Sequence, residues 1–152
     1  MSAFGIDVDP EAVCIFGQPL SKHDVLDALV AALNKTGIIT NIDEFRKAVH
    51  EREAVMSTGI GSGVAIPHVR SGAVKEPAVG LGLSPAGVDY DTLDNQPVHI
   101  IVLFAMPSGS QKDYLGLLAQ VMLAIKTEGF KERLLSCTTP EEATDVVNNT
   151  EI

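Results

Sequence analysis

The sequence predicts an α/β fold in which helices cover both faces of a central sheet, a three-layer α/β/α sandwich. Two observations carry this prediction. Segments with helical periodicity stand toward both ends of the chain, and short apolar segments typical of strands lie between them. At 152 residues the chain has the length of one domain, which we place over residues 1–152.

The N-terminal part predicts two helices. The first follows Ser21, a residue type that caps helix N-termini, and should end at Thr36-Gly37, where glycine favours termination. The second is expected over residues 42–55, with a buried stripe along one side. The apolar residues that recur at helical spacing are Val25, Leu26, Leu29, Val30 and Leu33 in the first helix, and Phe45, Ala48 and Val49 in the second.

The middle of the chain predicts the strands. We expect them over residues 64–69, 78–84 and 99–105. The third is almost continuously apolar, which is typical of a strand covered on both faces. Residues 89–97 are rich in Asp, Asn and Pro and therefore predict a loop.

Helical periodicity returns in the C-terminal part, over residues 111–126 and again over 130–135. A last helix should begin after Thr139. Pro140 suits its first turn, and Glu142 completes a capping box with Thr139. Three helices after the last strand complete the second helical layer.

Composition excludes several classes of protein. A formal net charge of −9, with only 11 scattered Lys and Arg residues, argues against nucleic-acid binding. Cys14 and Cys137 form no ligand motif, so we expect reduced thiols and no disulfide. The longest apolar run, residues 100–106, is far shorter than the roughly 20 residues of a membrane span, and the first residues lack a secretory signal. We therefore expect a cytoplasmic protein without membrane insertion.

The most informative segment is residues 52–68, which begins with Arg52-Glu53, carries three closely spaced glycines and ends at Pro67-His68. Glycines permit φ > 0 and a close approach of backbone to a ligand. Pro67 fixes its own φ and removes one amide donor beside the histidine. Taken alone, a glycine turn leading to a strand would be an ordinary connection, but the pattern favours presentation of the His68 imidazole.

This segment resembles the phosphoacceptor motif of EIIA domains of the bacterial sugar phosphotransferase system, in the fructose/mannitol class that includes nitrogen-regulatory EIIA proteins. Residues 94–98, the apolar run 100–105 and Pro107 also stand where that class has counterparts. The resemblance covers nearly the whole chain. It implies a mixed rather than all-parallel sheet and a phosphoryl group carried on His68.

Histidine suits such a carrier because neutral imidazole is a good nucleophile near neutral pH. Arg52 is the expected cation for the phosphoryl oxygens, and Glu53 is given a weaker supporting role as a hydrogen-bonding partner of Arg52 or another group. The turn should add an anion-binding set of amides and hydroxyls. Its expected members are Thr58, Gly59, Gly61, Ser62 and Gly63.

One position departs from the family pattern. The family usually has a second histidine before the Leu-x-x-Leu of the helix after Pro107, and this chain has Tyr114 there. A phenol donates one hydrogen bond but supplies no imidazolium near pH 7. The expected site is therefore His68, Arg52, Glu53 and Tyr114. The stability of the phosphohistidine, or the rate of onward phosphoryl transfer, then depends on how well the Tyr114 phenol replaces the second histidine.

No cofactor or metal is expected. His50-Glu51 begins like a zinc-protease helix, but position 54 is alanine instead of the second histidine. His23 and His50 are interpreted as solvated helix residues, and His99 as a residue at the entry to a strand.

The resemblance implies an HPr-like phosphocarrier as donor and an EIIB domain or a regulatory target protein as acceptor. Two other hypotheses remain open. In the first, the chain is a degenerate EIIA-like module that acts by contact alone because of Tyr114. In the second, it is an unrelated α/β enzyme that uses His68 as general base. The second ranks last, because the sequence has no nucleophile or cofactor motif to accompany His68.

Overall fold

A mixed sheet forms the centre of the molecule. The computed structural model describes residues 2–55, 57–109 and 111–150. Within them the sheet has six strands: five follow the order β1-β5-β6-β3-β2, and the sixth, β4, lies off this path and pairs with β6. β5 and β6 are antiparallel, whereas β1 runs parallel to β5, and both β3 and β4 run parallel to β6. The strands are β1 (Val13–Ile15), β2 (Gly59–Gly61), β3 (Val64–Ala65), β4 (His68–Ser71), β5 (Ala78–Val88) and β6 (Val98–Pro107).

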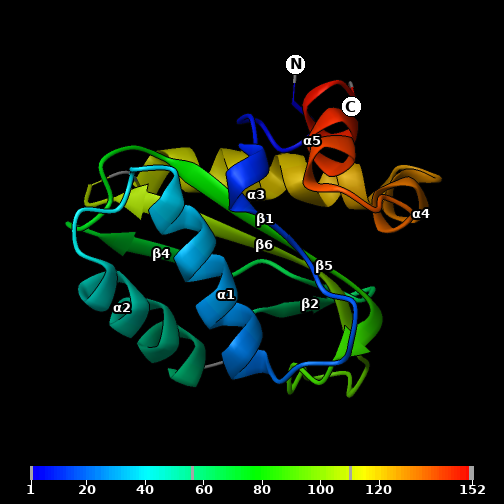
Figure 1. Cartoon of the computed structure of the whole chain (residues 1–152), viewed down its shortest axis with the longest axis horizontal. Helices are drawn as coiled ribbons and strands as arrows, with labels where there is room; N and C mark the ends of the chain where they lie inside the picture. The colour runs from blue at the N-terminus through cyan, green and yellow to red at the C-terminus, as the bar shows by residue number, and fades with distance from the viewer. Residues whose placement is uncertain (1, 56, 110, 151–152) are drawn as a thin grey trace.

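Helices cover both faces of this sheet, as the sequence predicts (Figure 1). α1 (Lys22–Lys35) and α2 (Ile42–Val55) pack on one face. α3 (Gln111–Lys126), α4 (Phe130–Leu135) and α5 (Pro140–Asn148) pack on the other. None of the described helices combines the length and apolar composition that crossing a bilayer requires.

β6 is the central strand and separates two hydrophobic cores. Its alternate residues Ile100, Val102 and Phe104 pack with α3, α4 and α5. The residues between them, Ile101 and Leu103, pack with α1 and α2. All five side chains are fully buried, and each contributes roughly 1.5–3 kcal/mol by leaving water. The nearly continuous apolar run thus has the role that the sequence predicts for it.

The strand expected over residues 64–69 is divided in two. β3 ends at Ala65 and β4 begins at His68, with Ile66 and Pro67 between them. Pro67 has no amide hydrogen for the ladder, but its carbonyl still accepts a hydrogen bond from the Phe104 amide at 2.9 Å. The interruption leaves His68 as the first residue of a new strand.

The predicted helix ends are confirmed where local chemistry fixes them. The Ser21 hydroxyl accepts a hydrogen bond from the Asp24 amide at the start of α1. Thr139 and Glu142 form the capping box of α5. A short 3-10 turn, Pro10–Ala12, leads into β1.

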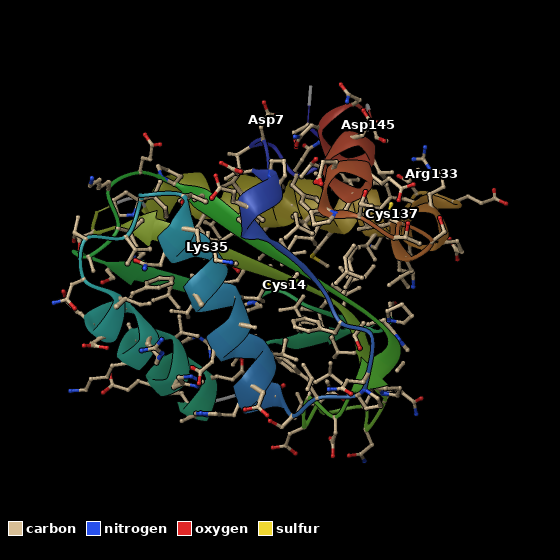
Figure 2. The ribbon with its side chains drawn as sticks, in the orientation of Figure 1. Asp7, Cys14, Lys35, Arg133, Cys137 and Asp145 are labelled. Atoms are coloured by element: carbon tan, nitrogen blue, oxygen red, sulfur yellow. The ribbon has the colours of Figure 1, made fainter. Side chains whose placement is uncertain are left out.

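The two cysteines are free thiols on opposite faces of the sheet. Figure 2 shows Cys14 of β1 next to α1, which ends at Lys35, and Cys137 below α5, which carries Asp145. Burial raises the pKa of both thiols, and nearby carboxylates raise that of Cys137 further. Protonated thiols are poor nucleophiles, so neither cysteine is a candidate reactive group.

Candidate functional site

His68 opens onto a cleft of about 590 Å³ between α2, β4 and the segment that follows β6. Val69, the next residue, turns toward the core under α1 and α2. Because side chains alternate along a strand, His68 and Arg70 share the other side of β4. The cleft lining includes Arg52 and Val55 from α2, His68 and Arg70 from β4, and Ser108 and Gly109 after β6.

Pairing with β6 sets the position of the imidazole. His68 stands opposite Phe104 in the parallel register, close to the end of β6. The carboxyl ends of strands in an open α/β sheet are where such folds usually bind ligands. The side chain is half-buried, so the ring is held by its surroundings while one part remains accessible.

Tyr114 from α3 lies directly on His68. The two rings stack with centroids 3.7 Å apart and planes 17° apart. Phe104 supports the phenol edge-on, with centroids 6.0 Å apart. Burial raises the pKa of Tyr114, so its hydroxyl remains a neutral hydrogen-bond donor at pH 7. The structure therefore brings together Tyr114, His68 and Arg52 as the sequence predicts.

The cleft favours a neutral imidazole. Burial is the largest cause that lowers the pKa of His68, and the guanidinium groups of Arg52 and Arg70 lower it further. A neutral ring keeps the lone pair that a nucleophile needs. The same two cations are placed to attract an anion brought to the ring.

A titration tests this electrostatic arrangement. We expect the His68 ring, followed by NMR, to titrate at a midpoint below the usual value of about 6.5. Arg70→Gln should move the midpoint upward, because one of the cations that disfavour imidazolium is removed. A midpoint at or above the usual value in the wild type would contradict the assignment.

Glu53 lies in a buried polar cluster. Lys22 of α1 pairs with its Oε2 at 2.7 Å, and the Thr58 amide donates to the same oxygen at 2.9 Å. The Tyr90 hydroxyl donates to Oε1 at 3.1 Å, and the Thr58 hydroxyl donates to Oε1 as well. Burial and the Glu53 charge raise the pKa of Tyr90, so the phenol keeps its proton. Glu53 thus ties α1, α2, the start of β2 and the loop after β5 together.

The glycine turn lies at some distance from His68. The Gly63 carbonyl accepts hydrogen bonds from the amides of His99 and Ile100, at 2.7 and 3.1 Å. His68 is instead opposite Phe104, four residues further along β6 than Ile100, so the two backbone positions are roughly 13 Å apart along that strand. The register thus places Gly63 away from His68 along the strand, and the expected phosphoryl-binding role of Thr58, Gly59, Gly61, Ser62 and Gly63 stays a prediction.

The turn residues have a different structural role. Gly61, Ser62 and Gly63 all have positive φ, between 57° and 87°, where β2 reverses into β3. A Cβ on Gly63 would meet the His99 ring at 3.2 Å. Gly59 pairs with Ala65 across the two strands, and the Thr58 hydroxyl faces Glu53 and Tyr90. These positions shape the backbone that leads to His68.

Three residues of the site and its support were not predicted from the sequence. Arg70 had an available signal, since it stands two residues after His68 in a strand. Lys22 and Tyr90 had none, because each is more than 30 residues from Glu53 and only folding brings them together.

Residues 9–150 match the family described as "Phosphoenolpyruvate-dependent sugar phosphotransferase system, EIIA 2". The chain belongs to this family. The matched residues include the helices and strands described above and the residues that line the His68 cleft, so the cleft belongs to an EIIA domain.

Several curated EIIA relatives are similar in sequence. The fructose-specific EIIABC component of Bacillus subtilis is 34% identical over 127 residues, which cover 84% of this chain and 20% of that protein. The chain thus spans about a fifth of that relative's length. The fructose-specific EIIA component of Haloferax volcanii is 27% identical over 90% of this chain and 89% of that protein. A nitrogen regulatory protein of Pseudomonas aeruginosa is 33% identical over 63% of this chain and 62% of that protein.

Solved EIIA structures share the fold. The nitrogen regulatory protein IIA-Ntr from Neisseria meningitidis matches with a TM-score of 0.83 and 22% identity, over 97% of this chain and all of that one (100%). IIA mannitol from Escherichia coli gives a TM-score of 0.76 and 19% identity, over 93% of this chain and 99% of that one. The mixed three-layer architecture is that of EIIA domains.

Proposed function

We propose that this EIIA domain carries a phosphoryl group on His68, which it accepts from a phosphohistidine of an HPr-like protein. One observation carries the proposal. The histidine that ends the family motif is held in an open cleft, with its pKa lowered by burial and by Arg52 and Arg70. A neutral nucleophile beside two cations suits transfer of an anionic group.

The transfer is a balanced exchange of one nitrogen–phosphorus bond for another. The lone pair of a His68 ring nitrogen attacks phosphorus, the bond to the donor imidazole breaks, and its electron pair returns to the donor ring. Transfer onward repeats the exchange with an acceptor nucleophile. The residues of this chain supply orientation and charge: Arg52 and Arg70 compensate the phosphoryl oxygens, and Tyr114 holds the His68 ring from one side.

For the acceptor we propose an EIIB domain. A complex of IIA mannitol with phosphorylated IIB mannitol from Escherichia coli contains a chain that matches this one with a TM-score of 0.75 and 18% identity. Because some relatives are nitrogen regulatory proteins, we also propose a regulatory use of the same group, in which its presence controls binding to a target protein. Both uses require the loading of His68 first.

Phosphate incorporation tests the proposal. The chain is incubated with phosphoenolpyruvate, enzyme I and HPr, and its intact mass is measured before and after acid treatment. We expect one added phosphoryl group that acid removes, because a phosphohistidine is labile where a serine ester is not. Absence of incorporation, with donors that load a known EIIA domain in parallel, would overturn the proposal.

A second candidate function rests on the phenol at position 114. Tyr114 covers one face of His68 and stays neutral, so it offers the phosphoryl group no cation. In this alternative the domain acts by contact with a partner and transfers little phosphate.

Tyr114→His distinguishes the two. If the phenol limits transfer, as the contact-only function requires, transfer from HPr should accelerate by about tenfold or more, because an imidazole can stack in the same place and take up a proton once the anionic phosphoryl group offsets the cations of the cleft. Tyr114→Phe is the matched control, since it keeps the ring and removes only the hydroxyl. An unchanged rate in Tyr114→His would mean that the phenol does not limit transfer, and the contact-only function would lose its support.

A further inference from the structure

Three metal-ligating side chains meet between α1 and α2, outside the lining of the His68 cleft. His23 Nε2 lies 3.2 Å from Asp27 Oδ2, and His50 Nε2 lies 2.7 Å from Asp27 Oδ1. The two imidazole rings stack, with centroids 4.4 Å apart. We name these three residues the α1–α2 cluster.

The helices set this arrangement. His23 and Asp27 are four residues apart on α1 and therefore share one face of that helix. His50 reaches the same carboxylate from α2. Neither helix contains the whole set, so the cluster exists only when the two helices pack.

The spacing of the donor atoms suits one small metal ion. One ligand atom from each of the three residues lies within 4.8 Å of the others. Ligand atoms about 2.0–2.2 Å from a tetrahedral Zn²⁺ stand roughly 3.3–3.6 Å from one another. The two contacts to Asp27, at 3.2 and 2.7 Å, need to open by less than one ångström to match.

We propose that His23, Asp27 and His50 bind a divalent transition-metal ion of the Zn²⁺ type, which bridges α1 and α2. Two imidazole nitrogens and one carboxylate oxygen are a ligand set that such ions accept, with water completing a tetrahedron. Asp27 accepts from both rings in the present arrangement, so an ion would replace the protons that its oxygens now face.

The exposure of the three side chains and the charges around them determine how readily an ion binds. The side chains of His23, Asp27 and His50 are 68%, 35% and 25% exposed, so the site is open on the His23 side. Partial burial raises the pKa of the Asp27 carboxyl. The charges and hydrogen bonds of His50, His23 and Arg46 lower it by more, so the carboxylate is ionised. Arg46 opposes the ion, because its Nε lies 3.5 Å from Asp27 Oδ1.

A bound ion would also fix the position of α2. His50 precedes Arg52 by two residues on this helix, and the Lys22–Glu53 pair joins the same two helices nearby. An ion that binds only the folded chain stabilises it by mass action. Metal binding would thus strengthen the helix pair that supports the His68 cleft.

Calorimetric titration with Zn²⁺ alone tests the proposal. We expect saturable binding of one ion per chain, weakened by about tenfold or more in His23→Gln, His50→Gln and Asp27→Asn. Glu51→Gln and His68→Gln are the matched controls and should retain wild-type affinity. Arg46→Gln should bind roughly fivefold more tightly, because a competing positive charge is removed.

Spectroscopy of the wild type keeps the test independent of the variants. Co²⁺ should give the intense visible bands of tetrahedral nitrogen and oxygen ligation, and Zn²⁺ should shift the NMR signals of the His23 and His50 rings but not those of His99. Excess Zn²⁺ should also raise the Tm by roughly 5 °C or more at a hundredfold excess over Kd. Absence of saturable binding, or binding lost in His68→Gln and kept in the cluster variants, would overturn the proposal.

Discussion

His68→Ala is expected to abolish phosphoryl loading, with a fall of about a thousandfold or more in the rate of transfer from HPr. Alanine removes the nucleophilic nitrogen, and no neighbouring group of the cleft that is described here replaces it. Intact-mass measurement after incubation with phosphoenolpyruvate, enzyme I and HPr reports the loss directly. Persistent incorporation in His68→Ala would place the phosphoryl group on another residue.

The fold should survive this change. His68 is half-buried in β4, which pairs with β6 through backbone hydrogen bonds that do not depend on the side chain. We expect the free energy of unfolding to change by about 1 kcal/mol or less. His99→Asn is the control, because an amide nitrogen can replace the ring nitrogen that faces the Ser84 carbonyl at 2.9 Å. That variant should load normally.

Glu53→Ala is expected to lower the free energy of unfolding by about 3–5 kcal/mol. The residue is 7% exposed, and its carboxylate serves Lys22, Thr58 and Tyr90. Alanine leaves a partly buried ammonium and three buried donor groups, from Thr58 and Tyr90, without this acceptor, and such groups are costly. Urea denaturation followed by circular dichroism measures the change, and the Tm should fall by roughly 10 °C.

Two variants make this prediction specific. Glu51→Ala removes an exposed carboxylate, two residues earlier on the same helix, whose ion pair with Lys47 is 3.8 Å long. It should change the stability by about 0.5 kcal/mol or less. Glu53→Gln keeps the size of the side chain and an acceptor oxygen but not the charge. Its loss of unfolding free energy should therefore lie between those of Glu51→Ala and Glu53→Ala. A Glu53→Ala protein as stable as Glu51→Ala would show that the buried cluster does not stabilise the fold.

Local sequence patterns predicted the helices and their ends. Caps such as Ser21 and the Thr139–Glu142 box involve residues within one turn of each other, so the sequence contains both partners. The apolar run that became β6 was recognisable for the same reason, since its burial on both faces excludes polar residues. The division of β3 from β4 at Pro67 was less visible, because it depends on which strand lies alongside.

The sequence by itself determined the fold class, the family motif and the choice of His68 as the candidate phosphoryl acceptor, because these depend on residue type and short spacing. The sequence also predicted Arg52 and Tyr114 beside that histidine, but only the tertiary structure decided how closely Tyr114 of α3 stacks on the imidazole and where the glycine turn lies. Gly63 bonds to the amides of His99 and Ile100, and Ile100 stands four residues, roughly 13 Å along β6, from the partner of His68. The Lys22–Glu53–Tyr90 contacts and the α1–α2 cluster likewise join residues that are distant along the chain. Such contacts follow from strand register and helix packing, which no local pattern specifies.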